Sequence, residues 1–277
     1  MKEMFLSGAI DLEAAFFSGQ AFRWERSDFG YIGSVEENAA AIYRLGDGYR
    51  LNWKGPAAEE YWLHYFDLER DYGAIAKRYD HDSRIKNAFD ICEGLRVLNQ
   101  PVWETLIAFI ISANNNDKRI RLIMRRLCES MGEKRQIEGF QVHLFPSIKA
   151  LAEAGSEKLR QLGCGYRAEY IAETSARVAA GYDLDSLKSM GYEAALKELV
   201  TFKGVGEKVA DCILLFSCGY SCAFPVDVWV ERVMQNLYGM EGNRRQIKAK
   251  SARLFGGDAG IVQQMLFHSA RKGRLDL

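Results

Sequence analysis

The first fifty residues show the alternation of apolar and polar positions that β-strands require. Segments 41–45 and 49–53 follow this pattern, and residues 46–48 between them read Gly-Asp-Gly. A glycine-rich turn between two such segments predicts an antiparallel β-hairpin. From about Ala57 the spacing of apolar residues changes toward that of a helix, so helices are expected to follow the strands.

From Pro101 onward the apolar positions keep a helical spacing. Pro101 fits the first turn of a long helix, and the asparagines at 114–116 interrupt that helix and can cap the next one. Further helices are expected near Ser147 and over residues 169–178, and helical structure almost throughout the rest of the chain. The buried faces of the first two helices are marked by Trp103, Leu106, Ile107, Ile110 and Ile111, then by Ile120, Ile123, Met124 and Leu127.

These patterns predict an α+β protein. We expect an N-terminal α+β domain with an antiparallel β-sheet over residues 1–95, and a mainly α-helical region over residues 96–277. Within the helical region, two helices joined by a short hairpin are expected at about residues 194–218. A chain of 277 residues can form one large domain or two modest ones, each with its own core.

Composition is that of an ordinary globular protein, with 48% hydrophobic and 27% charged residues. The longest apolar stretch, 106–111, falls far short of the ~20 residues of a membrane span. Since the N-terminus also lacks a signal-peptide core, we expect an intracellular protein, cytoplasmic or nucleoid-associated if prokaryotic. The six cysteines show no Cys-x-x-Cys pair and no C-terminal cluster of four, so free thiols are expected and neither a zinc nor an iron–sulfur site.

Net charge does not favour a nucleic-acid partner. Lysine plus arginine equals aspartate plus glutamate at 37 each, whereas DNA-binding proteins are usually basic. A local cationic groove or free backbone N–H groups can nevertheless hold phosphates in a neutral protein.

The strongest local signal is the Gly204-Val205-Gly206 turn between two apolar helical faces. Glycine on each side of Val205 permits backbone conformations and close approaches that a Cβ forbids. The second helix therefore begins with free N–H groups beside a bare backbone, which suits a phosphate of any sequence. The alternative is a tight helix–helix turn without a ligand.

Residues 202–206 resemble the hairpin of the helix–hairpin–helix DNA glycosylases. That superfamily also carries a proline-containing stretch with an aspartate downstream, and residues 224–228 read Phe-Pro-Val-Asp-Val here. Asp227 is the candidate carboxylate, because breaking an N-glycosidic bond leaves positive charge on the sugar. Asp227 is also placed to cap a helix, and both roles are compatible.

Lys208 is the candidate nucleophile. A deprotonated lysine amine can attack C1′ of the sugar, displace the base and form a Schiff base. The alternative is a solvated surface lysine, which describes most lysines. In the superfamily, lysine at this position marks the bifunctional members, which also cut the strand, so the resemblance implies base excision followed by β-elimination.

Other segments resemble the 8-oxoguanine DNA glycosylase/lyase branch in particular, from residue 19 to residue 267. They are Gly19-Gln20-Ala21-Phe22-Arg23-Trp24, Ser112-Ala113-Asn114-Asn115-Asn116 with Arg119-Ile120, Leu162-Gly163-Cys164-Gly165-Tyr166-Arg167-Ala168, Lys208-Val209-Ala210-Asp211-Cys212 and Met265-Leu266-Phe267.

The resemblance implies a role for each of several residues. Asn114 fills the hole left by a flipped nucleotide and Tyr166 wedges into the base stack, while Arg119 and Arg167 bind the opposite base. In the base pocket, Cys212 and Phe267 sandwich the base and Gln263 reads its Watson–Crick edge. The Gly19 carbonyl accepts a hydrogen bond from N7–H, a donor that guanine lacks. Plain structural roles remain open for four of them: helix core for Phe267, an inert thiol for Cys212, a cap for Asn114 and a solvated charge for Arg167.

One position departs from the pattern of this branch. Trp229 stands where the eukaryotic-type enzymes carry a histidine near the phosphate. Tryptophan donates a single hydrogen bond and carries no charge, which leaves that contact open.

Two other functions compete with 8-oxoguanine excision. A glycosylase for alkylated bases is disfavoured by Lys208 and by the Gly19-Gln20 pair. A non-catalytic helix–hairpin–helix DNA-binding protein explains the neutral charge but does not need Lys208, Asp227 and Gln263 together. The expected partner is double-stranded DNA containing 8-oxoguanine, bound by a monomer without a cofactor, with room for a structural cation at the hairpin.

Overall fold

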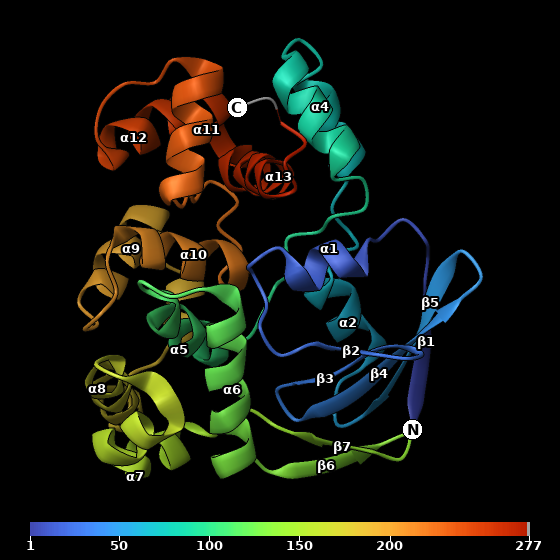
Figure 1. Cartoon of the computed structure of the whole chain (residues 1–277), viewed down its shortest axis with the longest axis vertical. Coiled ribbons are helices and arrows are strands. Elements are labelled where there is room, and N and C mark those ends of the chain that lie inside the picture. Colours follow the sequence, from blue (N-terminus) through green and yellow to red (C-terminus); the bar gives the residue numbers. More distant parts are fainter. Residues whose placement is uncertain (276–277) are drawn as a thin grey trace.

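An antiparallel sheet forms the N-terminal part of the computed structural model, which describes residues 1–275. Its strands follow the order β1-β5-β4-β3-β2, and helices surround the sheet on one side and extend away from it (Figure 1). The strand bounds are β1 Lys2–Leu6, β2 Glu25–Ser27, β3 Gly30–Val35, β4 Asn38–Leu45 and β5 Gly48–Lys54.

The expected hairpin is confirmed as β4 and β5. Leu45 pairs with Gly48 and Ile42 pairs with Leu51, which leaves a two-residue turn. Gly46 takes a φ of 60° in that turn, a left-handed conformation that glycine adopts without strain.

The rest of the described chain is mainly helical, as the spacing predicts. The helix bounds are α1 Leu12–Phe17, α2 Glu59–Tyr65, α3 Tyr72–Arg78, α4 Ser83–Ile91, α5 Val102–Ser112, α6 Asp117–Met131, α7 Ile148–Leu159, α8 Arg167–Ala179, α9 Tyr192–Val200, α10 Glu207–Ser217, α11 Val228–Tyr238, α12 Arg244–Phe255 and α13 Ala259–Arg271. Short helical turns of other types occupy 160–164, 185–188 and 256–258.

A second hairpin interrupts the helical region, where helices were expected almost throughout. Strands β6, Lys134–Ile137, and β7, Phe140–His143, pair with each other and lie beside β3 and β4 of the sheet (Figure 1). Ile137 is buried against Ala39 and Ala41 of β4. Each strand has only four residues, too few for an alternating pattern to stand out in the sequence, and the contacts that hold them come from residues about a hundred positions earlier.

The buried apolar residues fall into two main cores. One lies under the sheet and includes Trp53, Trp62 and Phe66. The other runs through the helices, includes Tyr72 and Ile75 on α3, and also takes in Ala14 and Phe22 from the N-terminal part of the chain.

Helix α10 connects the helical core to the loop that contains Gly19. Helix α10 packs against α5 and α9, while α11 packs against α13 (Figure 1). The Gln100 N–H donates to the Phe216 carbonyl at 2.7 Å, and the Gln100 side chain donates to the Gln20 carbonyl at 2.8 Å. The segment before α5 thus joins the end of α10 to the loop that contains Gly19. No helix within residues 1–275 is both long and apolar enough to cross a membrane.

Candidate active site

The hairpin between α9 and α10 presents backbone at its tip. Gly204 has a φ of 83°, and a Cβ at this position would lie 2.4 Å from Cδ2 of Tyr170, so only glycine fits. Val205 is buried and its N–H donates to the Phe202 carbonyl at 3.0 Å. Gly206 is the N-cap of α10 and supplies no side-chain cap. The first N–H groups of α10 are therefore available to an anion, as expected for a phosphate site.

Lys208 lies in the first turn of α10 and is half-buried. Its Nζ is 5.5 Å from the centroid of the Phe109 ring, which α5 supplies. Within residues 1–275 it forms no salt bridge with a carboxylate. An amine beside an aromatic ring and without an anionic partner is a suitable setting for a lysine nucleophile.

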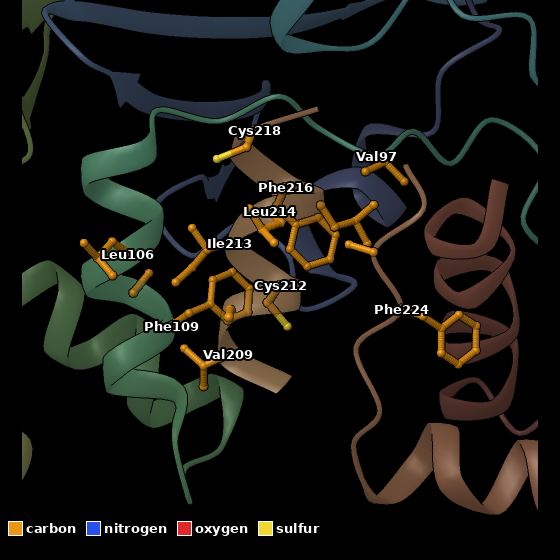
Figure 2. Packing of buried hydrophobic residues seen from close by; sticks show 14 of the residues in the cluster. Val97, Leu106, Phe109, Val209, Cys212, Ile213, Leu214, Phe216, Cys218 and Phe224 are labelled. Atoms are coloured by element: carbon orange, nitrogen blue, oxygen red, sulfur yellow. The ribbon is translucent and has the colours of Figure 1, made fainter. Parts of the chain in front are cut away.

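Cys212 follows Lys208 by one helical turn and is buried (Figure 2). Burial raises the pKa of its thiol to about 11, although the nearby Lys208 ammonium opposes that shift. The Asp227 carboxylate acts on the same thiol from α11 and raises its pKa further. Lys208, Cys212 and Asp227 are thus electrostatic neighbours, and the Cys212 thiol is a neutral apolar wall rather than a nucleophile.

Asp227 is the N-cap of α11, which confirms its predicted capping position. Its Oδ1 accepts a hydrogen bond from the Val230 N–H at 2.9 Å. This bond fixes the carboxylate orientation and leaves Oδ2 without a hydrogen-bond partner in the described part of the chain. A carboxylate held in this way can face positive charge that develops on a sugar.

Gly19 and Phe267 lie against each other. Gly19 has a φ of 86°, and a Cβ there would lie 3.6 Å from the Phe267 ring. Gln263, one turn earlier on α13, is 4% exposed, and its Oε1 has no hydrogen-bond partner among residues 1–275. A buried unpaired acceptor is costly unless a ligand supplies the donor, so this position suits a base edge.

The residues expected to replace the flipped nucleotide gather at the junction of α5 and α6. Asn114 is exposed with a φ of 51°, and Tyr166 is 51% exposed with its hydroxyl donating to the Ala113 carbonyl at 3.3 Å. Arg119 is exposed on the first turn of α6, where the Asn116 side chain caps the helix.

Arg167 points inward in this structure. It is 4% exposed, and its guanidinium donates to the carbonyls of Ala113 and Asn114 and lies over the Tyr166 ring. It therefore caps the C-terminal end of α5 in the protein alone. Binding an opposite base with Arg167 requires the loop at Asn114 to change these contacts.

Trp229 is 40% exposed on the first turn of α11, beside Asp227. The Arg232 guanidinium lies 5.9 Å from its ring centroid. The surface beside Asp227 therefore presents an indole with a guanidinium near its ring.

Two contributors to the site escaped the sequence analysis. Phe109 is only one position of the apolar stretch 106–111 in the sequence, and its contact with Lys208 joins α5 to α10. Arg121 could have been noticed as the (i, i+4) partner of Asp117, but its contacts to residues 16–24 are not visible in a sequence pattern. Among residues 1–275, no three His, Cys, Asp or Glu side chains gather in a way that could hold a metal ion.

Comparison with known families covers nearly the whole chain in two parts. Residues 107–256 match the HhH-GPD superfamily of base excision DNA repair proteins. Residues 5–106 match the N-terminal domain of 8-oxoguanine DNA glycosylase.

Individual relatives agree with this division. An N-glycosylase/DNA lyase of Saccharomyces cerevisiae is 37% identical over 169 residues, which are 56% of this chain and 45% of the yeast protein. A probable N-glycosylase/DNA lyase of Methanothermobacter thermautotrophicus is 34% identical over 76% of this chain and 73% of its own length. The match thus spans less than half of the yeast relative and about three quarters of the archaeal one.

A solved structure is similar over almost its full length. The 8-oxoguanine glycosylase/lyase of Clostridium acetobutylicum, in complex with double-stranded DNA containing cytosine opposite 8-oxoguanine, superposes with a TM-score of 0.90 at 35% identity. The match covers 96% of this chain and 93% of that one.

Proposed function

This chain belongs to the HhH-GPD superfamily of base excision DNA repair proteins, in its 8-oxoguanine glycosylase branch, and we propose that it excises 8-oxoguanine from duplex DNA and then cleaves the strand. The observation that carries the proposal is Lys208, half-buried at the mouth of the hairpin beside Phe109 and Cys212, whose thiol is also acted on by the Asp227 charge. The protein acts as a monomer on the DNA of the cell interior.

Binding begins at the hairpin, whose uncapped N–H groups donate hydrogen bonds to a backbone phosphate of DNA of any sequence. The lesion leaves the duplex, and the exposed Tyr166 and Asn114 occupy the stack and the vacated space. Extrusion costs a few kcal/mol, which these contacts offset.

Recognition takes place between α13 and the loop at Gly19. The base stacks between Phe267 and Cys212, and the unpaired Oε1 of Gln263 accepts a hydrogen bond from its Watson–Crick edge. The Gly19 carbonyl accepts from N7–H, so guanine leaves this acceptor unpaired.

Chemistry follows at C1′ of the sugar. The Lys208 amine bonds to C1′ while the C1′–N9 bond breaks, and the base leaves with that electron pair and takes up a proton. The Asp227 carboxylate stabilises the positive charge on the sugar. The opened sugar forms a Schiff base between C1′ and Nζ of Lys208. Loss of a C2′ proton then expels the 3′ phosphate by β-elimination. Water finally hydrolyses the Schiff base and releases Lys208.

Three duplexes test the proposal, one with 8-oxoguanine, one with an alkylated purine and one without a lesion. We expect base release and strand nicking with 8-oxoguanine only. Release of the alkylated purine without nicking would indicate a glycosylase for alkylated bases. Tight binding of all three duplexes without product would indicate a non-catalytic DNA-binding protein.

A further inference from the structure

We propose that Arg121 and Gln264 are positioning residues that hold the Gly19 carbonyl in place for lesion recognition. This inference rests on the proposed function and assigns a role to side chains that contact neither the base nor the sugar. The Arg121 guanidinium lies on α6 and the Gln264 amide on α13, so the loop of residues 18–24 is fixed from two separate elements.

Arg121 binds three backbone carbonyls on both sides of Gly19. Its Nη2 donates to the Phe16 carbonyl at 2.6 Å and to the Ala21 carbonyl at 2.8 Å, and its Nη1 donates to the Trp24 carbonyl at 3.2 Å. The Phe16 carbonyl belongs to the last turn of α1, where helix carbonyls lack intrahelical donors and a cation is favourable. A single planar guanidinium thus joins the end of α1 to the two segments after Gly19.

The Arg121 side chain is itself held in one orientation. Its Nε donates to Asp117 Oδ2 at 2.9 Å, and its guanidinium lies 4.5 Å from the centroid of the Phe17 ring. Its side chain is 19% exposed, so these bonds are largely shielded from water. Asp117 directly follows Asn116, the N-cap of α6. The Arg121 contacts therefore lie next to the segment that carries Asn114, the residue expected to fill the space left by the flipped nucleotide.

Gln264 fixes the other side of the same loop. Its Nε2 donates to Ser18 Oγ at 2.9 Å and lies 3.4 Å from the Ser18 carbonyl. Gln264 is 2% exposed and directly follows Gln263, so the loop is fastened to the helix that also carries Phe267.

Gln20 completes the support on the far side of Gly19. Its Oε1 accepts from the Leu98 N–H at 2.8 Å, and its own carbonyl accepts from Gln100 at 2.8 Å. Gly19 therefore sits between two residues, Ser18 and Gln20, whose side chains and carbonyls form hydrogen bonds within the protein. The Gly19 carbonyl itself accepts no hydrogen bond from the described residues, which leaves it for a ligand.

Selectivity by one carbonyl depends on its position, because a misplacement of about 1 Å at a recognition contact can cost about 100-fold in rate. Loss of the guanidinium frees three carbonyls and lets the loop shift. This shift weakens recognition of the base, whereas the Arg121 hydrogen bonds within the described residues do not reach α10, the helix that carries Lys208.

The test compares two reactions in Arg121→Met, Arg121→Lys and Gln264→Leu. In Arg121→Met we expect the single-turnover release of 8-oxoguanine opposite cytosine to fall between about tenfold and about 100-fold. Nicking of a preformed abasic site, which has no base to recognise, stays close to the wild-type rate. Arg121→Lys keeps the positive charge but loses the planar guanidinium with its several donors, so it is also expected to release 8-oxoguanine more slowly. Gln264→Leu is expected to slow the same reaction.

Arg84→Met is the matched control. Arg84 likewise pairs with an aspartate, donates to a backbone carbonyl and stacks on an aromatic ring, but it contacts Asp82, Leu237 and Tyr238 instead of the Gly19 loop. This variant is expected to keep the wild-type ratio of base release to abasic-site nicking.

Amide hydrogen exchange of residues 16–24 tests the positioning independently of catalysis. Exchange is expected to speed up in Arg121→Met and in Gln264→Leu and to stay unchanged in Arg84→Met. Equal loss of both reactions, or unchanged base release and exchange in folded variants, would overturn the inference. A wild-type protein that neither releases 8-oxoguanine nor nicks abasic sites would instead refute the proposed function, while the exchange data would still decide whether the loop is held as described.

Discussion

Individual side chains in this site combine structural and chemical roles, and Asp227 shows this most directly. Its Oδ1 caps α11 through the Val230 N–H, while its charge reaches Cys212 and the surroundings of Lys208. The capping role needs only an oxygen acceptor, whereas charge stabilisation needs a carboxylate. Substitution by asparagine therefore separates the two roles.

We expect Asp227→Asn to release 8-oxoguanine about 100-fold more slowly than the wild type, since a fixed charge near developing positive charge is lost. Its free energy of unfolding is expected to stay within about 0.5 kcal/mol of the wild-type value, because asparagine caps helices about as well as aspartate. Single-turnover kinetics and urea unfolding measure the two quantities. A stable variant with full activity would leave Asp227 only its capping role.

His268, next to the base pocket, is expected to make the stability of the protein depend on pH. It is 7% exposed, its Nε2 has no hydrogen-bond partner within residues 1–275, and it directly follows Phe267. Burial lowers the pKa of the imidazole from 6.5 to about 4, and the charge of Lys272 adds to this effect. The native protein therefore holds His268 neutral at pH values where the unfolded chain binds a proton.

Stability is consequently expected to fall as the pH decreases from 6.5 toward about 4. Above 6.5 neither state is protonated and His268 causes no pH dependence. Below it the free energy of unfolding decreases by about 1 kcal/mol per pH unit, the order of magnitude expected for one proton bound only by the unfolded chain. Urea unfolding at several pH values checks this slope, which His268→Gln should reduce. An unchanged slope in the variant would assign the acid sensitivity to other groups.

Among the elements, α12 holds the helix that carries Lys208. Lys248 on α12 is 2.6 Å from Asp211 Oδ2 on α10, and the Tyr192 hydroxyl of α9 donates to Asp211 Oδ1 at 2.6 Å. Burial raises the pKa of Asp211, although Lys248 and Tyr192 oppose the shift. Three helices thus meet at one carboxylate that is 1% exposed.

We expect Lys248→Met to lower the free energy of unfolding by roughly 3 kcal/mol, because it leaves Asp211 buried without a counter-charge. The double variant Lys248→Met/Asp211→Asn should recover most of this loss, since the uncompensated charge is gone. Urea unfolding of the two single variants and the double variant forms a double-mutant cycle. Additive losses would show that the ion pair does not couple these helices.

Elements with strong local patterns were predictable from the sequence. The β4–β5 hairpin, α5, α6, the turn at Gly204 and the cap at Asp227 each depend on signals within a few residues. The β6–β7 hairpin and the inward position of Arg167 depend on partners far away in the chain, and four-residue strands carry almost no periodic signal. The same holds for Arg121, whose partners lie about a hundred residues earlier.

The distribution of charge over the whole molecule explains how a protein of zero net charge can bind DNA. Many cations are neutralised within the fold, as on α12, where Arg244 pairs with Glu231 and Arg245 with Glu207. By contrast Arg119 and Arg232 are exposed and form no salt bridge with residues 1–275. Exposed cations without a carboxylate partner therefore lie on α6 and α11, two of the elements assigned to DNA.

Lys208 is expected to form a covalent intermediate with the sugar of an 8-oxoguanine nucleotide. Borohydride reduction of the protein on a duplex with 8-oxoguanine opposite cytosine, followed by peptide mapping, tests it most directly. Lys203→Gln is the matched control, since Lys203 lies in the same hairpin but is exposed and 3.0 Å from Glu173. We predict a trapped adduct on Lys208 in the wild type and in Lys203→Gln, and no adduct in Lys208→Gln. An adduct on any other residue, or undiminished trapping by Lys208→Gln, would contradict the account.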